Sequence, residues 1–179
     1  MLSREDAELF YKLFFPLLDF VNKKFKINSE IGDIYFGKRI DFRNAKEIAD
    51  RLWKNTALID EYLSKNDLSE EHKNIVLGWK KRISGDFIVE RHLKKGSVFI
   101  HTENEEVYLV SGIISSWDEM LRGRPLPAAL NAVLIPFKDV IISDGLVMTS
   151  GVFFGKNMTL EFKDIYLNAK KNASIHKSF

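Results

Sequence analysis

Residues 86–113 read DFIVERHLKKGSVFIHTENEEVYLVSGI, and this stretch decides the fold class. Apolar and polar side chains alternate through three runs, 86–93, 98–102 and 107–113, which is the period of a strand with one buried face. Two polar segments, KKGS and ENEE, separate the runs and have the composition of turns between antiparallel strands. The stretch therefore predicts a three-stranded antiparallel meander that begins at Asp86.

Upstream of this stretch, apolar residues recur with helical spacing. Pro16 lies on the polar stripe of the first helical segment, so we expect one helix that bends there instead of two helices. A second helical pattern is interrupted at Asn55-Thr56, and residues 27–43 show neither period. Gly85 follows the last helical pattern and is expected to end its helix.

Downstream of the meander, further strand and helix signals follow. Strands are expected at 131–137, 140–143 and 146–154, and helices at 116–121 and 156–171. Ser116 is the predicted N-cap of the shorter helix, and Ser69 is the predicted N-cap of the last helix before the meander. Asp144-Gly145 has the composition of a type I′ hairpin turn, and Lys138-Asp139 is expected to form the preceding corner.

Together these patterns predict an α+β fold. We expect a mainly helical subdomain, residues 1–84, packed on an antiparallel β-sheet subdomain, residues 85–179, which includes the short helix 116–121 and the C-terminal helix 156–171. Six strands are enough for such a sheet to curl toward a barrel.

Composition excludes several classes of site. The chain has no cysteine, which excludes disulfides, cysteine-bound zinc, iron–sulfur clusters and thiol nucleophiles. The most apolar run, residues 10–21, is interrupted by charges and a proline and is too short to span a bilayer. The first ten residues, MLSREDAELF, lack the pattern of a secretory signal. We therefore expect a cytoplasmic protein with no membrane partner.

The first predicted hairpin offers a candidate metal site. With a four-residue loop at Lys94–Ser97, Glu90 falls opposite His101, and His92 shares their face. Two imidazoles and a carboxylate can bind zinc or iron and leave positions open for water. A three-residue loop instead places His101 opposite Val89, and the simpler alternative is a solvated sheet face with one cross-strand Glu–His pair. A divalent metal is the one cofactor that the sequence suggests, because nucleotide-binding and hydrolase motifs are missing.

Basic residues in the second half form a candidate surface for an anion or nucleic acid. The residues concerned are Lys94, Lys95, Arg122, Arg124, Lys170 and Lys171. The alternative is ordinary solubilising charge, which is favoured because residues 86–179 carry 11 Lys+Arg and 11 Asp+Glu and are therefore neutral.

Several segments are similar to those of one protein family. They are FYKLFFPLLDFVN (10–22), LSEEHKNIVLGWKKRISGDFIVERHLKKGSVFI (68–100), VLIPFKDVIISDGL (133–146) and FGKNM (154–158). Over most of its length the chain thereby resembles an uncharacterised family of cytosolic bacterial proteins, with Ser143 where an aromatic residue is expected. The resemblance implies no established activity, cofactor or catalytic residue.

The sequence as a whole favours a non-enzymatic binding or regulatory protein, because no catalytic constellation or cofactor fingerprint is present. A protein partner is favoured over nucleic acid, and the broad apolar face of the Phe-rich first helix fits either a core or a homodimer interface. The alternative function is a metal-dependent hydrolase that uses Glu90, His92 and His101.

Overall fold

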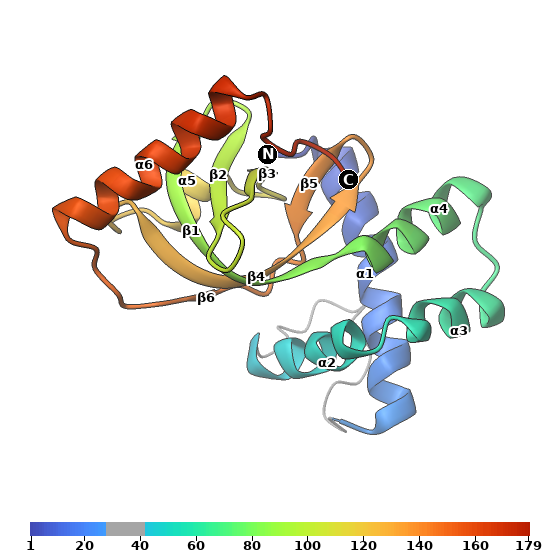
Figure 1. Ribbon diagram of the computed structural model, residues 1–179. Coiled ribbons are helices and arrows are strands. Elements are labelled where there is room, and N and C mark those ends of the chain that lie inside the picture. Colours follow the sequence, from blue (N-terminus) through green and yellow to red (C-terminus); the bar gives the residue numbers. More distant parts are fainter. Residues whose placement is uncertain (28–41) are drawn as a thin grey trace. The chain divides into compact units, whose positions relative to one another are not determined.

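The computed structural model describes residues 1–27 and 42–179, so most of the segment expected to be irregular lies outside the described residues. The chain divides into two compact units (Figure 1). One unit is Arg4–Lys80, and the other combines Met1–Ser3 with Lys81–Phe179. None of the helices within the described ranges is long and apolar enough to cross a membrane.

The first unit is helical, as predicted. Its elements are α1 (Arg4–Phe25), α2 (Phe42–Lys54), α3 (Ala57–Lys65) and α4 (Glu70–Gly78), and a 3₁₀ helix (Trp79–Lys81) continues into the second unit. α1 continues through Pro16 as a single helix, and the interruption at Asn55-Thr56 separates α2 from α3. Ser69 is the N-cap of α4, because its side chain accepts a hydrogen bond from the His72 N–H at 3.3 Å.

The aromatic residues of α1 fill the core of this unit. Phe10 and Phe14 stack with ring centroids 5.2 Å apart, and the Phe14 ring lies 6.1 Å from Trp53 and 5.7 Å from Trp79. All four side chains are buried, so this part of the apolar face of α1 serves the core of its own chain.

The second unit contains a six-stranded sheet and two helices, which confirms the α+β class. The strands are β1 (Ile83–Leu93), β2 (Gly96–His101), β3 (Val107–Ser111), β4 (Ala128–Phe137), β5 (Val140–Ser143) and β6 (Met148–Thr149). The helices are α5 (Trp117–Met120), capped by Ser116, and α6 (Lys156–Lys171). The meander β1–β2–β3 and both helices are present as predicted, although β1 begins at Ile83, three residues before the predicted start, and β2 at Gly96, two residues before it.

Five of the strands pair in a closed circuit. β1 pairs antiparallel with both β2 and β4, β2 with β3, and β4 with β5, whereas β3 and β5 run parallel. The short helix α5 lies in the connection between β3 and β4. This strand order is the one found in the OB-fold, a five-stranded Greek-key architecture. The shared topology by itself assigns no function.

Alternate side chains of the strands enter two apolar layers. The inner layer includes Phe87, Phe99 and Tyr108, and α5 adds Trp117, whose ring centroid lies 4.7 Å from that of Phe99. On the outer face α6 packs across β1, β2 and β3 (Figure 1). This outer layer contains Ile88, Val98, Ile100 and Val107 of the strands together with Tyr166 and Ala169 of α6.

One predicted helix end differs from the structure, and one predicted turn is confirmed. Gly85 does not end a helix; it lies inside β1 opposite Ala132, because α4 already ends at Gly78. Lys138-Asp139 does form a two-residue turn between β4 and β5, as predicted, with Lys138 at a φ of 51°.

The Asp144-Gly145 pair does not make a hairpin. Strands β5 and β6 both pair antiparallel with β4, so the chain keeps its direction from β5 to β6, and residues 144–147 form a bulge between them. Gly145 has the positive φ expected of it, 80°, and Asp144 is buried. The predicted strand 146–154 shrinks to the two residues of β6.

Candidate functional site

The observed pairing of β1 with β2 differs from the register that the predicted metal site requires. The turn between β1 and β2 has two residues, Lys94 and Lys95, because Leu93 pairs with Gly96. A bulge at Glu90 then shifts the register, and His101 pairs with Phe87. The prediction that Glu90 lies opposite His101 is therefore wrong.

Each of these residues has a separate set of contacts. Glu90 binds the neighbouring Arg91, whose guanidinium carbon lies 4.2 Å from the centre of the Tyr166 ring on α6. The hydrogen bond from Arg91 to Glu90 raises the pKa of Arg91 above its ordinary value. His92 instead contacts two other elements. Its Nδ1 lies 2.7 Å from Ser97 Oγ on β2, and its Nε2 lies 3.8 Å from Asp118 Oδ1 on α5.

His101 lies on the inner side of the sheet. Its ring packs edge-on against Phe87 with centroids 5.0 Å apart, and its Nδ1 accepts the Glu103 N–H at 3.2 Å. Within residues 1–27 and 42–179, no group of three His, Asp or Glu side chains lies close enough to hold a metal ion.

The residues of the predicted basic surface lie in three separate places: the β1–β2 turn, the α5–β4 connection and the last turn of α6. Lys94 and Lys95 are exposed in the β1–β2 turn, and Arg122 is exposed between α5 and β4. The Arg124 guanidinium donates to the Ser150 carbonyl at 3.2 Å, so it contacts the chain that follows β6. Lys170 and Lys171 are exposed in the last turn of α6.

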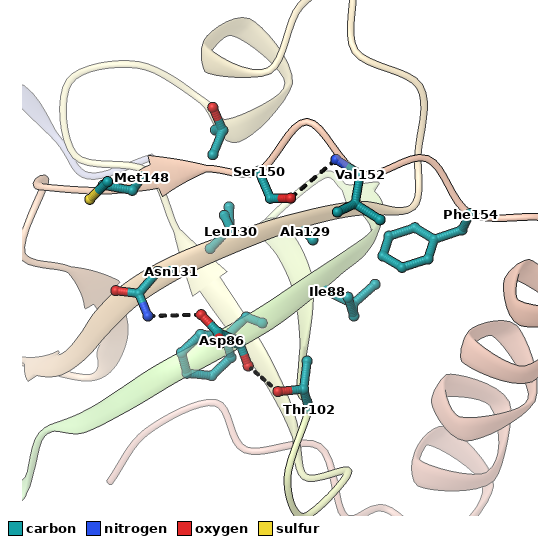
Figure 2. A pocket seen from close by; sticks show the side chains of 12 residues that line it. Asp86, Ile88, Thr102, Ala129, Leu130, Asn131, Met148, Ser150, Val152 and Phe154 are labelled. Atoms are coloured by element: carbon teal, nitrogen blue, oxygen red, sulfur yellow. Dashed lines mark hydrogen bonds between the residues drawn. The ribbon is translucent and has the colours of Figure 1, made fainter.

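The structure contains a groove that the sequence did not predict. It lies on the outer face of β1, β4 and β6, and we refer to it as the outer groove. Residues that line it include Asp86, Ile88, Ala129, Asn131, Met148, Ser150, Val152 and Phe154 (Figure 2). Its volume is about 480 Å³, which falls in the range of roughly 300–1,000 Å³ that is typical of ligand pockets.

Strand register explains why these side chains share one face. Asp86 pairs with Asn131, which pairs with Met148, and this gives one row across the three strands. Ile88 pairs with Ala129, whose carbonyl accepts the Ser150 N–H at 2.9 Å, and this gives the second row. Because cross-strand neighbours and alternate residues point to the same face, both rows lie on the floor of the outer groove.

The two ends of the outer groove differ in polarity. At the polar end, the Asn131 amide donates to Asp86 Oδ1 at 2.8 Å, and the Thr102 hydroxyl donates to the Asp86 carbonyl at 3.1 Å (Figure 2). At the apolar end Phe154 lies beside α6, where it packs against the outer apolar layer and contacts Phe162 at 5.1 Å between ring centroids. The outer groove thus lies beside the part of the sheet face that α6 covers, and Ile88 and Phe154 belong both to the groove and to the outer apolar layer.

Exposed apolar side chains surround this groove. Met148 and Val152 are each 55% exposed, and Phe153, which lies between two lining residues, is 80% exposed. Large exposed apolar residues gathered beside a groove are typical of an interaction surface. The sequence carries one signal for it, the motif GVFFG at 151–155, in which two adjacent phenylalanines cannot both face the interior of a strand.

Comparisons with known proteins identify no counterpart. No family model, no curated protein and no solved structure matches the chain.

Proposed function

We propose that the protein is a non-enzymatic binding protein of the cytoplasm and that it binds a protein partner through the outer groove. The observation that carries this proposal is the outer groove in the sheet face beside α6, lined by Ile88, Ala129 and Phe154 and bordered by the exposed Met148 and Phe153. The polar groups at the other end supply a small number of oriented hydrogen-bonding sites, which is the usual composition of a specific binding surface.

The chemistry of the outer groove favours protein over nucleic acid. No lysine or arginine lines it, and the one ionisable side chain among its lining residues is Asp86. A phosphate backbone needs basic groups along its path, whereas the basic residues of this unit lie in the β1–β2 turn, the α5–β4 connection and the end of α6. In addition, α6 covers the outer side of β2 and β3, the strands that OB-folds commonly use to bind oligonucleotides.

No observation favours the alternative of a metal-dependent hydrolase. Glu90 contacts Arg91, His92 contacts Ser97 and Asp118, and His101 packs against Phe87.

The proposal is tested by selecting peptides from a random displayed library against the purified chain. We expect enrichment of peptides with apolar side chains. We also expect Met148→Arg to abolish their binding, because Met148 lines the groove and the larger cationic side chain fills it. The matched control is Ile114→Arg, since Ile114 is 69% exposed and does not line the groove. Selected peptides that bind the Met148→Arg variant as well as the wild type would contradict the proposal.

A further inference from the structure

We infer that the partner which fits the outer groove is a second copy of this chain, with Phe153 of each copy inserted into the groove of the other. This inference rests on the proposed function and names the occupant of the same groove. It follows from three properties of the surface: apolar complementarity, charge complementarity and position.

Apolar complementarity comes from Phe153. Its neighbours Val152 and Phe154 both line the groove, whereas Phe153 itself is 80% exposed. An aromatic side chain this exposed leaves most of its apolar surface in water, and a pocket floored by Ile88 and Ala129 removes that surface from water. Phenylalanine is also among the residues enriched in the buried centre of protein interfaces.

Charge complementarity comes from Asp86 and Lys156. Asn131 occupies one oxygen of the Asp86 carboxylate, which is exposed at the polar end of the groove. Lys156, three residues after Phe153, is exposed at the first position of α6. A phenylalanine followed by a lysine thus matches a groove that is apolar at Ile88 and anionic at Asp86.

The spacing of these groups is compatible with one joint contact. Asp86 and Ile88 lie two residues apart on β1, a separation of roughly 7 Å in a strand. Phe153 and Lys156 lie three residues apart, which an extended chain spans in at most about 10 Å. When the Phe153 ring enters the groove at Ile88, Lys156 therefore has the reach to approach the Asp86 carboxylate.

Because the groove and the Phe153 segment lie next to each other, each copy can insert its Phe153 and also receive that of its partner. The groove and the inserting segment are adjacent, because the segment that supplies Phe153 also supplies Val152 and Phe154 to the groove wall. A two-fold dimer requires a patch that is its own complement, so that each contact occurs twice. Here one surface patch contains both the outer groove and the Phe153 side chain that would enter the groove of the other copy.

The first experiment measures self-association of the full chain by sedimentation velocity from low micromolar to submillimolar concentration. We expect a reversible monomer–dimer equilibrium in which Phe153→Ser or Met148→Arg raises the dissociation constant at least about tenfold. Ile114→Ser, which removes an exposed apolar side chain outside the groove, is expected to leave it unchanged. A wild-type chain that stays monomeric throughout, or a Phe153→Ser variant that dimerises like the wild type, overturns the inference.

The second experiment tests the Asp86–Lys156 contact across the two copies. Asp86→Lys and Lys156→Asp are each expected to weaken self-association several-fold, because each homodimer then contains two like-charged pairs. Mixing the two variants is expected to restore dimers, since both cross-copy pairs are again of opposite sign. A mixture that associates no better than its components overturns the inferred contact.

The outcomes also separate this inference from the proposed function. A monomeric chain that still selects peptides sensitive to Met148→Arg has a different protein as its partner, which overturns the inference and supports the proposed function.

Discussion

The His101 ring packs directly against Gly85, because a Cβ atom added to Gly85 would lie 2.6 Å from His101 Nε2. The two residues come from adjacent strands, and the imidazole is buried with its edge against Phe87. The absence of a side chain at Gly85 therefore leaves the space that this ring occupies, so the glycine meets a packing requirement and does not end a helix.

Gly85→Ala should lower the free energy of unfolding by about 1–3 kcal/mol, because overpacking a well-filled site displaces a buried ring. This cost exceeds the gain of roughly 0.4–1 kcal/mol that replacing glycine gives through the unfolded chain. Urea unfolding measures the change. Gly151→Ala is the matched control, since its added Cβ meets no atom within 4 Å among the described residues beyond its two chain neighbours. In a His101→Ala background the penalty of Gly85→Ala should shrink, and an undiminished penalty would show that the ring is not its cause.

Gly145→Val should lower the free energy of unfolding by about 1–3 kcal/mol. The cause is backbone strain, because Gly145 has a φ of 80° while its added Cβ meets only Ile113 Cδ1 at an ordinary 3.6 Å. Thermal and urea unfolding of the variant and of Gly151→Val, at an exposed glycine with open space, provide the comparison. Equal stability of the two variants would contradict a requirement for positive φ in the bulge.

Ser116→Ala should lower the free energy of unfolding by about 1 kcal/mol, the usual effect of removing an N-cap. Ser116 Oγ accepts the Glu119 N–H at 3.2 Å, and Glu119 Oε2 accepts the Ser116 N–H at 2.9 Å, which forms a capping box. The box holds the first residue of α5, Trp117, in the inner core. The change can be followed by Trp fluorescence during urea unfolding, and Ser116→Asp, which keeps a capping oxygen, should retain most of the stability.

Tyr108→Phe should make the stability of the protein less sensitive to alkali. Burial and the hydrogen bond that its hydroxyl donates to Glu106 raise the pKa of Tyr108 in the folded state. The folded state therefore keeps this proton when the unfolded chain loses it. The resulting contribution to stability is present below the ordinary tyrosine pKa of about 10 and is lost as the pH rises above it.

The measurement for Tyr108 is the difference in melting temperature between wild type and Tyr108→Phe as a function of pH. The wild type should lose stability relative to the variant above a pH of about 10. A difference that stays constant from neutral to strongly alkaline pH would contradict the raised pKa of this residue.

Local sequence signals determined the parts of the fold that depend on neighbours in the chain. Ser69 and Ser116 marked the starts of α4 and α5, helical spacing gave α6 as Lys156–Lys171, and alternation gave the β1–β2–β3 meander. Each of these features depends on hydrogen bonds or on a periodic apolar face within a short segment, and both are encoded by the residues of that segment.

Tertiary structure alone decided the registers and directions that create the candidate site. The two-residue turn at Lys94-Lys95 and the bulged residue Glu90 together change the partner of His101 from the predicted Glu90 to Phe87, which separates the predicted metal ligands. The bulge at residues 144–147 keeps β6 antiparallel to β4, which places Met148 beside Asn131 in the outer groove.

The physical reason is that pairing between strands depends on residues far apart in the sequence. A strand's alternation fixes which side chains share a face, but a shift of one residue exchanges the faces without changing the pattern. The sequence by itself therefore determined the α+β class and most of the elements of this protein. The closed pairing of β1 with β4, the part of the sheet that α6 covers, and hence the outer groove were decided by long-range packing.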